Sequence, residues 1–176
     1  SGSNNLTLEA GQDVIINSAV DIDSGDLTIT SGRNLTVGAN LSSATFAATV
    51  TGDATINSTI NTSSGTLTIE ADNDLTVGAN LTTSNTGNSA VVLNAGKNDD
   101  AGTSSGGQVI ISGSPTISTG SGGRATFFTG SVSGSTGLTN LVGAGTGHFR
   151  YHSDETSTNY TNALSAGKYV ILMMNL

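Results

Sequence analysis

The chain has 176 residues, which is enough for one substantial domain, and it contains 24 Gly, one Pro, no Cys and only 10% charged residues. Thirteen acidic side chains against five basic ones give a formal charge of −8. This balance argues against a nucleic-acid partner, because phosphate contacts need clustered Lys and Arg. No apolar run reaches the length of a transmembrane helix, so we expect no membrane insertion.

A repeated unit begins directly after residues 1–3, whose Ser-Gly-Ser composition indicates a cloning scar. Residues 25–29 and 34–41 recur, with one change in each part, as residues 65–69 and 74–81, 40 positions later. This period divides into two shorter units. The first strands of successive units are predicted to start at Leu6, Leu27, Ala48 and Leu67, in steps of 21, 21 and 19 residues. A fixed internal period of this length is typical of solenoid proteins.

Within each unit, apolar residues alternate with Thr over short runs that Gly, Asn, Asp or Ser interrupts. Alternation with a period of two predicts strands with one buried face, and the runs are too short for typical helices. We therefore predict an all-β fold, a parallel β-helix or β-solenoid with about 20 residues per coil. A single coil cannot bury its apolar stripe, so stacked coils should share one core.

The inward-facing positions should form three walls. The first wall comprises Leu6, Leu8, Leu27, Ile29, Val50, Leu67 and Ile69, the second Val14, Ile16, Leu35, Val37, Ile56, Leu75 and Val77, and the third Val20, Leu41, Ile60 and Leu81. Two outward columns should consist of Thr, namely Thr7, Thr28, Thr49 and Thr68, and then Thr36, Thr55 and Thr76. Asn40 and Asn80 fall at equivalent corners, where side-chain amides are expected to stack.

The later part of the chain first continues the repeat and then departs from it. Residues 91–96 and 125–130 repeat the first half of the unit, and residues 109–112 follow an inserted polar loop at 97–107. We therefore expect coils over residues 4–130. From residue 131 the alternation fades, so residues 131–176 should form a terminal coil and cap, or the junction to a following module. Because solenoids need protected ends, a repeat that starts without a cap predicts a piece of a longer parent chain.

The repeats resemble those of filamentous-haemagglutinin-like exoproteins, which are exported by two-partner secretion. Residues 124–131, with residues 149–151 and 159–160, are similar to a segment that joins such helices to Ig-like modules in large bacterial adhesins. The resemblance covers most of residues 4–170. It implies a right-handed parallel β-helix, a hand that parallel crossover connections also favour. It further implies a secreted or cell-surface adhesin of a Gram-negative bacterium.

Acidic residues raise the alternative of a polysaccharide-active β-helix enzyme. The candidates are Asp21, Asp23 and Asp26 near Arg33, then Asp72 with Asp74, and Asp99 with Asp100. A glycosidase needs two carboxylates about 5–9 Å apart across a cleft, and a lyase adds a base and positive charge. No aromatic platform accompanies these carboxylates in the sequence. We therefore expect them to shape turns by accepting local backbone hydrogen bonds, and we predict no enzymatic activity.

Two further patterns could hold a metal ion. Residues 97–100, Lys-Asn-Asp-Asp, are the best candidate for calcium, although a solvated loop also explains them. His148, Arg150 and His152 should share one strand face. Two His without Cys, and with Arg between them, make a poor zinc site. We predict no catalytic residue, no cofactor and no metal ligand, and the residues of any binding surface stay unassigned.

The Thr columns raise a second alternative, an ice-binding solenoid. Ice-binding faces usually carry Thr-x-Thr, whereas each strand here supplies one outward Thr, and Ile15, Val92 and Ile110 interrupt the columns. High β-propensity accounts for the Thr content. The preferred function is a structural and display segment of a large adhesin. It would form a rigid rod for cell-surface or biofilm-matrix adhesion, with weak multivalent glycan contact through its loops, especially residues 97–107.

Overall fold

The computed structural model describes residues 4–103, 105–143 and 145–175, and nearly all of its regular structure is β-strand. The first five coils contain β1 (Leu6–Ala10), β2 (Val14–Ile16), β3 (Val20–Asp21), β4 (Leu27–Ser31), β5 (Leu35–Val37), β6 (Leu41–Ser43), β7 (Phe46–Val50), β8 (Ala54–Ile56), β9 (Ile60–Thr62), β10 (Leu67–Ala71), β11 (Leu75–Val77), β12 (Leu81–Thr83), β13 (Val91–Ala95), β14 (Val109–Ile111) and β15 (Ile117–Ser118). The remaining elements are β16 (Arg124–Thr129), α1 (Leu138–Val142), the 3-10 helix η1 (Thr146–His148), β17 (Phe149–Arg150) and β18 (Gly167–Leu172).

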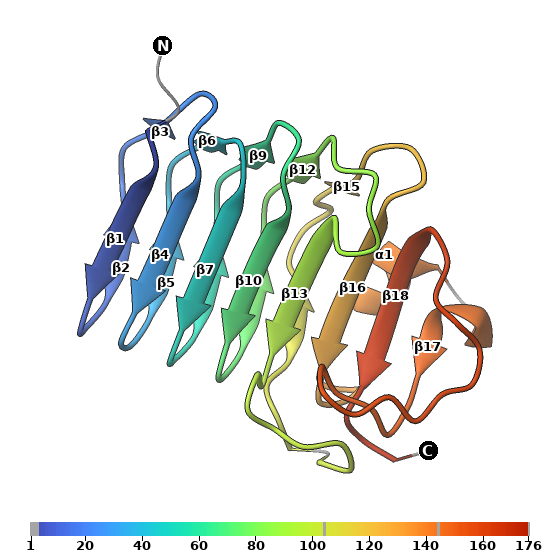
Figure 1. Ribbon diagram of the computed structural model, residues 1–176. Helices are drawn as coiled ribbons and strands as arrows, with labels where there is room; N and C mark the ends of the chain where they lie inside the picture. The colour runs from blue at the N-terminus through green and yellow to red at the C-terminus, as the bar shows by residue number, and fades with distance from the viewer. Residues whose placement is uncertain (1–3, 104, 144, 176) are drawn as a thin grey trace.

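The strands form three parallel sheets that run the length of the molecule. The first sheet has the order β1-β4-β7-β10-β13-β16-β18-β17, the second β2-β5-β8-β11-β14, and the third β3-β6-β9-β12-β15. In Figure 1 the coils advance from left to right while the front strands run downward and the chain returns upward behind them, which is a right-handed course. The predicted right-handed parallel β-helix is confirmed.

The core lies between the sheets, and the second and third predicted walls are confirmed. Leu35 pairs with Ala54, which pairs with Leu75, and all three are fully buried. The third wall continues beyond its predicted members, because Leu81 pairs with Ile117. Packed apolar side chains in register give each coil a neighbour on both sides, which replaces the core that one coil cannot build.

The predicted register of the third coil is wrong by two residues in the first sheet. β7 begins at Phe46, which pairs with Leu27 on one side and Leu67 on the other, so the first-strand steps are 21, 19 and 21 residues. Val50 consequently occupies a third inward position, between Ser31 and Ala71. Phe46 is fully buried. Its large side chain fills the column of the repeated Leu. The free energy gained by burying it outweighs the alignment of Thr49 with Thr28 and Thr68 on which the predicted register rested.

The same shift breaks the first outward Thr column. Thr28 pairs with Ala47, which pairs with Thr68, whereas Thr49 lies beside Thr30 and Glu70. The second column is in the predicted register, since Thr55 lies between Thr36 and Thr76. The predicted amide stack is also interrupted: Thr59 occupies the corner between Asn40 and Asn80, and the Asn80 Oδ1 accepts a hydrogen bond from the Thr116 amide at 2.8 Å.

After the fifth coil the chain closes the end of the helix. α1 takes the place that a second-sheet strand would occupy, and it buries Leu138 and Val142 against the core. The chain then forms β17, and residues 151–166, here named the strap, return to β18. β18 adds to the first sheet beside β16, and β17 lies at its edge. Figure 1 shows the strap joining the lower end of β17 to the upper end of β18.

Candidate functional site

The acidic residues at the corner between the first and second sheets form a hydrogen-bonded ladder along the rod. Asp13 Oδ1 accepts from the Asn34 amide at 3.0 Å, Asn34 Oδ1 from the Asp53 amide at 2.9 Å, and Asp53 Oδ1 from the Asp74 amide at 3.2 Å. Asp74 Oδ1 continues to the Gln108 amide at 2.8 Å. Each side chain thus binds the backbone of the next coil. The sequence predicted local turns, but the ladder connects successive coils.

The first carboxylate cluster is a set of turn formers. Asp21 Oδ1 accepts from the Asp23 amide at 3.1 Å, and Asp23 has a left-handed φ of 51°. β3 ends at Asp21, so Asp21 and Asp23 do not share a strand face as carboxylates facing a substrate would. Asp26 donates its amide to Asn5 Oδ1 at 2.9 Å. The Asp21 contact agrees with the expectation that this carboxylate shapes a turn, whereas Asp26 takes part through its backbone amide.

Arg33 pairs with Asp13, and not with the cluster of Asp21, Asp23 and Asp26 that lies nearer to it in sequence. Its Nε donates to Asp13 Oδ1 at 2.7 Å, and its Nη2 binds the second carboxylate oxygen. Hydrogen bonds from the Arg33 guanidinium and from the Asn34 amide hold the pKa of Asp13 below its ordinary value of 3.8. The pair is therefore ionised throughout the neutral range and fixes the corner of the first two coils.

Several carboxylates gather at an open groove near the inserted loop. Asp53, Asp72, Asp74 and Asp99 line this groove, whose volume is about 420 Å³. Asp99 Oδ2 accepts the Gly107 amide at 3.2 Å, and Lys97 Nζ lies 3.1 Å from Glu70 Oε2. Within residues 4–103, 105–143 and 145–175, no three His, Cys, Asp or Glu side chains are placed to hold a metal ion. Within the calcium candidate 97–100, Lys97 therefore forms an ion pair with Glu70, and Asp99 closes the loop through its hydrogen bond with the Gly107 amide.

The two histidines do not share a strand face, so that expectation is wrong. β17 contains only residues 149–150; His148 belongs to η1, and His152 lies beyond the strand with a left-handed φ of 52°. A ring nitrogen of His148 lies 2.9 Å from the Lys168 carbonyl oxygen. Its ring centroid lies 5.8 Å from that of Tyr169. The structure therefore separates the residues that alternation would have aligned.

The strap is fixed to the rod through a buried carboxylate. Asp154 is 6% exposed; its Oδ2 accepts the Ala101 amide at 2.8 Å, and its Oδ1 accepts the amide and hydroxyl of Thr156 at 2.6 and 2.8 Å and the amide of Ser157. Burial raises the pKa of Asp154, but these hydrogen bonds outweigh it and place the pKa below 3.8. The inserted loop 97–107, predicted as a free contact surface, is thereby docked to the strap.

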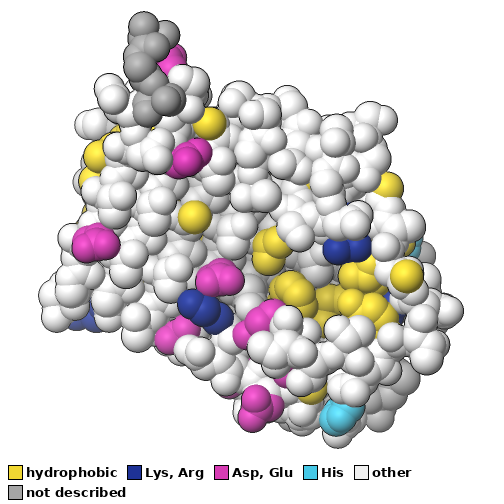
Figure 2. Space-filling view, viewed as in Figure 1, with side chains coloured by type: hydrophobic (Ala, Val, Ile, Leu, Met, Phe, Trp, Pro, Cys, Tyr) yellow, Lys and Arg dark blue, Asp and Glu magenta, His cyan; other side chains and the backbone are white. Residues whose placement is uncertain are grey.

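The strap covers part of the outer face of the first sheet. Asn94, Thr126 and Tyr169 occupy outward positions, yet each is buried. Arg124 Nη1 donates to the Leu164 carbonyl at 3.1 Å and holds the other end of the strap. Hydrophobic side chains gather over this end of the face, whereas the opposite end shows mostly polar surface (Figure 2).

A cleft of about 370 Å³ opens between β17 and the strap. Its lining residues are Phe149, Arg150, Tyr151, Asn159, Tyr160, Thr161 and Asn162. The guanidinium carbon of Arg150 lies 5.5 Å from the centroid of the Tyr160 ring and 5.6 Å from that of Tyr169. Two tyrosines, Tyr160 of the strap and Tyr169 of β18, are thus placed beside one arginine. No sequence period brings them together, because the strap is not a repeat.

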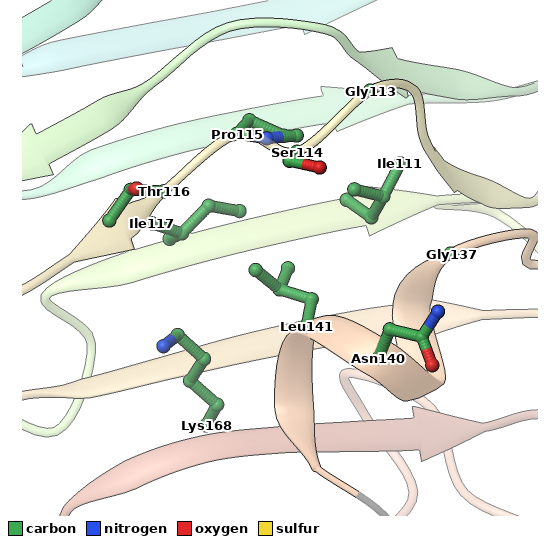
Figure 3. A pocket seen from close by; sticks show the side chains of 10 residues that line it. All are labelled: Ile111, Gly113, Ser114, Pro115, Thr116, Ile117, Gly137, Asn140, Leu141 and Lys168. Atoms are coloured by element: carbon green, nitrogen blue, oxygen red, sulfur yellow. The ribbon is translucent and has the colours of Figure 1, made fainter.

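A second hollow, of about 340 Å³, lies at the closed end of the helix. Figure 3 shows Leu141 of α1 and the Lys168 side chain facing Ile117 across it, with Ile111 and Pro115 at its border. It occupies the space left where α1 replaces a second-sheet strand and where the third sheet ends at β15. The hollow, with its mixed apolar and polar lining, is a consequence of ending the stack.

Along the described chain, no helix has the length and apolar composition that a bilayer crossing requires. Comparisons with protein-family models, with curated proteins and with solved structures found no match to this chain.

Proposed function

We propose that this chain is a structural and display segment of a large adhesin, secreted to the cell surface of a Gram-negative bacterium. The supporting observation is the uninterrupted stack of parallel strands in three sheets, with the corner ladder from Asp13 to Gln108 joining successive coils. Backbone hydrogen bonds in such a stack run along the rod axis and resist bending. The segment holds adhesive surfaces away from the cell and makes weak glycan contacts of its own.

The polar surface supports contact with a hydrated matrix. Outward positions on the coils carry Thr, Ser and Asn, such as Thr36, Ser42 and Asn61. Hydroxyl and amide groups exchange hydrogen bonds with sugars at little net cost, and many weak contacts along a rod add to a useful avidity.

The test is retention on a biofilm matrix. Fluorescent beads coated with the protein are applied to matrix from a Gram-negative biofilm under flow, and released reducing ends are measured at the same time. The matched control is Ile69→Asp, which places a charge at a fully buried position and should unfold the coils. Retention of wild-type beads alone, without sugar release, supports the proposal. Equal retention of both bead types contradicts it, and sugar release would favour a polysaccharide-active enzyme.

A further inference from the structure

Arg150 is a half-buried cation without a counter-charge in the part of the chain that the structure describes. Its Nη1 donates to the carbonyl oxygens of Gly147 and Phe149 at 3.1 and 3.0 Å. Its buried Nε has no hydrogen-bond partner among the described residues, and the ion pairs found there involve Arg33 and Lys97 instead. An uncompensated charge of this kind is unfavourable, and an entering anion would relieve it.

The surroundings hold the guanidinium in a fixed orientation. It lies within cation–π distance of both the Tyr160 and the Tyr169 rings, and this attraction favours its position. The Asn159 side-chain amide donates to the His152 carbonyl oxygen, which fixes the start of the opposite wall. An arginine held in this way loses little side-chain entropy when it binds a carboxylate.

The cleft combines apolar and polar walls in the way that a sugar requires. A sugar ring has C–H groups that pack on aromatic side chains and hydroxyl groups that pair with amides. Tyr160 provides the first kind of wall, and Thr161 and Asn162 provide the second. Phe149 and Tyr151 also line the cleft, but their side chains pack against the core.

The charge distribution favours this end of the rod for an acidic ligand. Residues 124–176 contain three of the five basic side chains, Arg124, Arg150 and Lys168, but only two of the thirteen acidic ones, Asp154 and Glu155. Subtraction leaves two basic and eleven acidic side chains in residues 1–123. The inserted loop docked to the strap adds Lys97, Asp99 and Asp100, so this end carries equal numbers of basic and acidic side chains. An anionic glycan is therefore repelled by most of the rod and least repelled at the end that carries the cleft.

We propose that the cleft between β17 and the strap binds a carboxylated sugar of an acidic glycan, with Arg150 pairing with the carboxylate and Tyr160 packing on the ring. This inference rests on the proposed function, since it places the glycan contact of the adhesin segment at one site. Uronic acids and sialic acids share the required carboxylate, and the probes below separate them.

The test is titration of the full chain with tetragalacturonate and with its methyl ester, and with sialyllactose and lactose. A carboxylated probe should bind saturably, and its uncharged counterpart should bind at least about tenfold more weakly. Arg150→Gln should abolish binding. Because that change could loosen the strap, Asn162→Asp supplies a second variant: Asn162 is exposed, so the fold should survive while the added charge weakens binding about tenfold. Asn17→Asp, at an exposed position of the first coil, is the matched control and should bind normally.

Preference for sialyllactose over lactose, or for tetragalacturonate over its ester, supports the site and identifies the sugar class. The inference is overturned by equal binding of charged and uncharged probes, by normal binding in Asn162→Asp, or by no saturable binding of either acid. Bead retention distinguishes these failures from failure of the proposed function. If the beads are retained on the matrix although the cleft does not bind the acidic probes, the glycan contact lies elsewhere on the rod and the proposed function stands.

Discussion

Asp154 offers a direct test of how the strap is fixed to the rod. Asp154→Ala removes the acceptor for the amides of Ala101, Thr156 and Ser157 and for the Thr156 hydroxyl. Thr156 and Ser157 are exposed, so water can replace their lost bonds, whereas Ala101 is half-buried. The poorly hydrated Ala101 amide and the loss of charge-assisted hydrogen bonds together should lower the free energy of strap opening by about 2–3 kcal/mol. The cost should fall on strap opening, because the coils do not depend on these contacts.

Hydrogen exchange measures this opening. A loss of 2–3 kcal/mol corresponds to exchange about 30- to 160-fold faster at the strap amides, with little change in the core amides of β7 and β10. Asp154→Asn keeps one acceptor and should lie between wild type and Ala. The neighbouring Glu155→Gln is the control: desolvation raises the pKa of Glu155, with repulsion from Asp154 and Glu70 adding to the rise, so removing its charge should not weaken the strap.

The pH dependence gives the sign of the Asp154 effect. The folded-state pKa of Asp154 is depressed below 3.8, so its stabilisation is fully present above that value and is lost as the pH falls through the folded-state pKa. The penalty of Asp154→Asn should therefore be full at pH 7 and should shrink in strong acid. Unchanged strap exchange in Asp154→Ala, or a penalty that does not shrink in acid, would refute the assigned role.

Two further predictions concern the coils. Ile69→Asp should unfold the rod, because it places a carboxylate at a fully buried position, whereas Thr68→Ser on the outer face should change the free energy of unfolding by less than about 0.5 kcal/mol; similar denaturation midpoints for the two variants would show that the inward and outward faces are misassigned. Gly107→Ala should destabilise the base of the inserted loop, since an added Cβ would lie 2.2 Å from the Asn73 carbonyl oxygen. Gly11→Ala, where no atom lies within 4 Å of the added Cβ, is its control in thermal unfolding, and an equal effect of both would contradict the tight packing of Gly107 against the preceding coil.

The sequence determined the class of fold because each coil repeats the same local chemistry. Alternation of Leu67, Thr68 and Ile69 is a local pattern that specifies a strand and its buried face. The period then specifies stacking, since a coil of this length must bury its face on its neighbours. The register of β7 could not be obtained in this way, because Phe46 has no counterpart in the other first strands and only the shape of the shared core decides which residue fills the Leu column.

The candidate site depended on contacts that no local pattern encodes. The strap crosses to another part of the chain, so Arg150 meets Tyr160 and Tyr169 only once β18 has paired with β16. Asp154 likewise binds Ala101, 53 positions away in sequence. A repeat predicts its own contacts because neighbouring coils are related by a fixed step. Where the repeat ends, pairing between distant segments is decided by burial and hydrogen bonding in three dimensions, and only the tertiary structure shows the result.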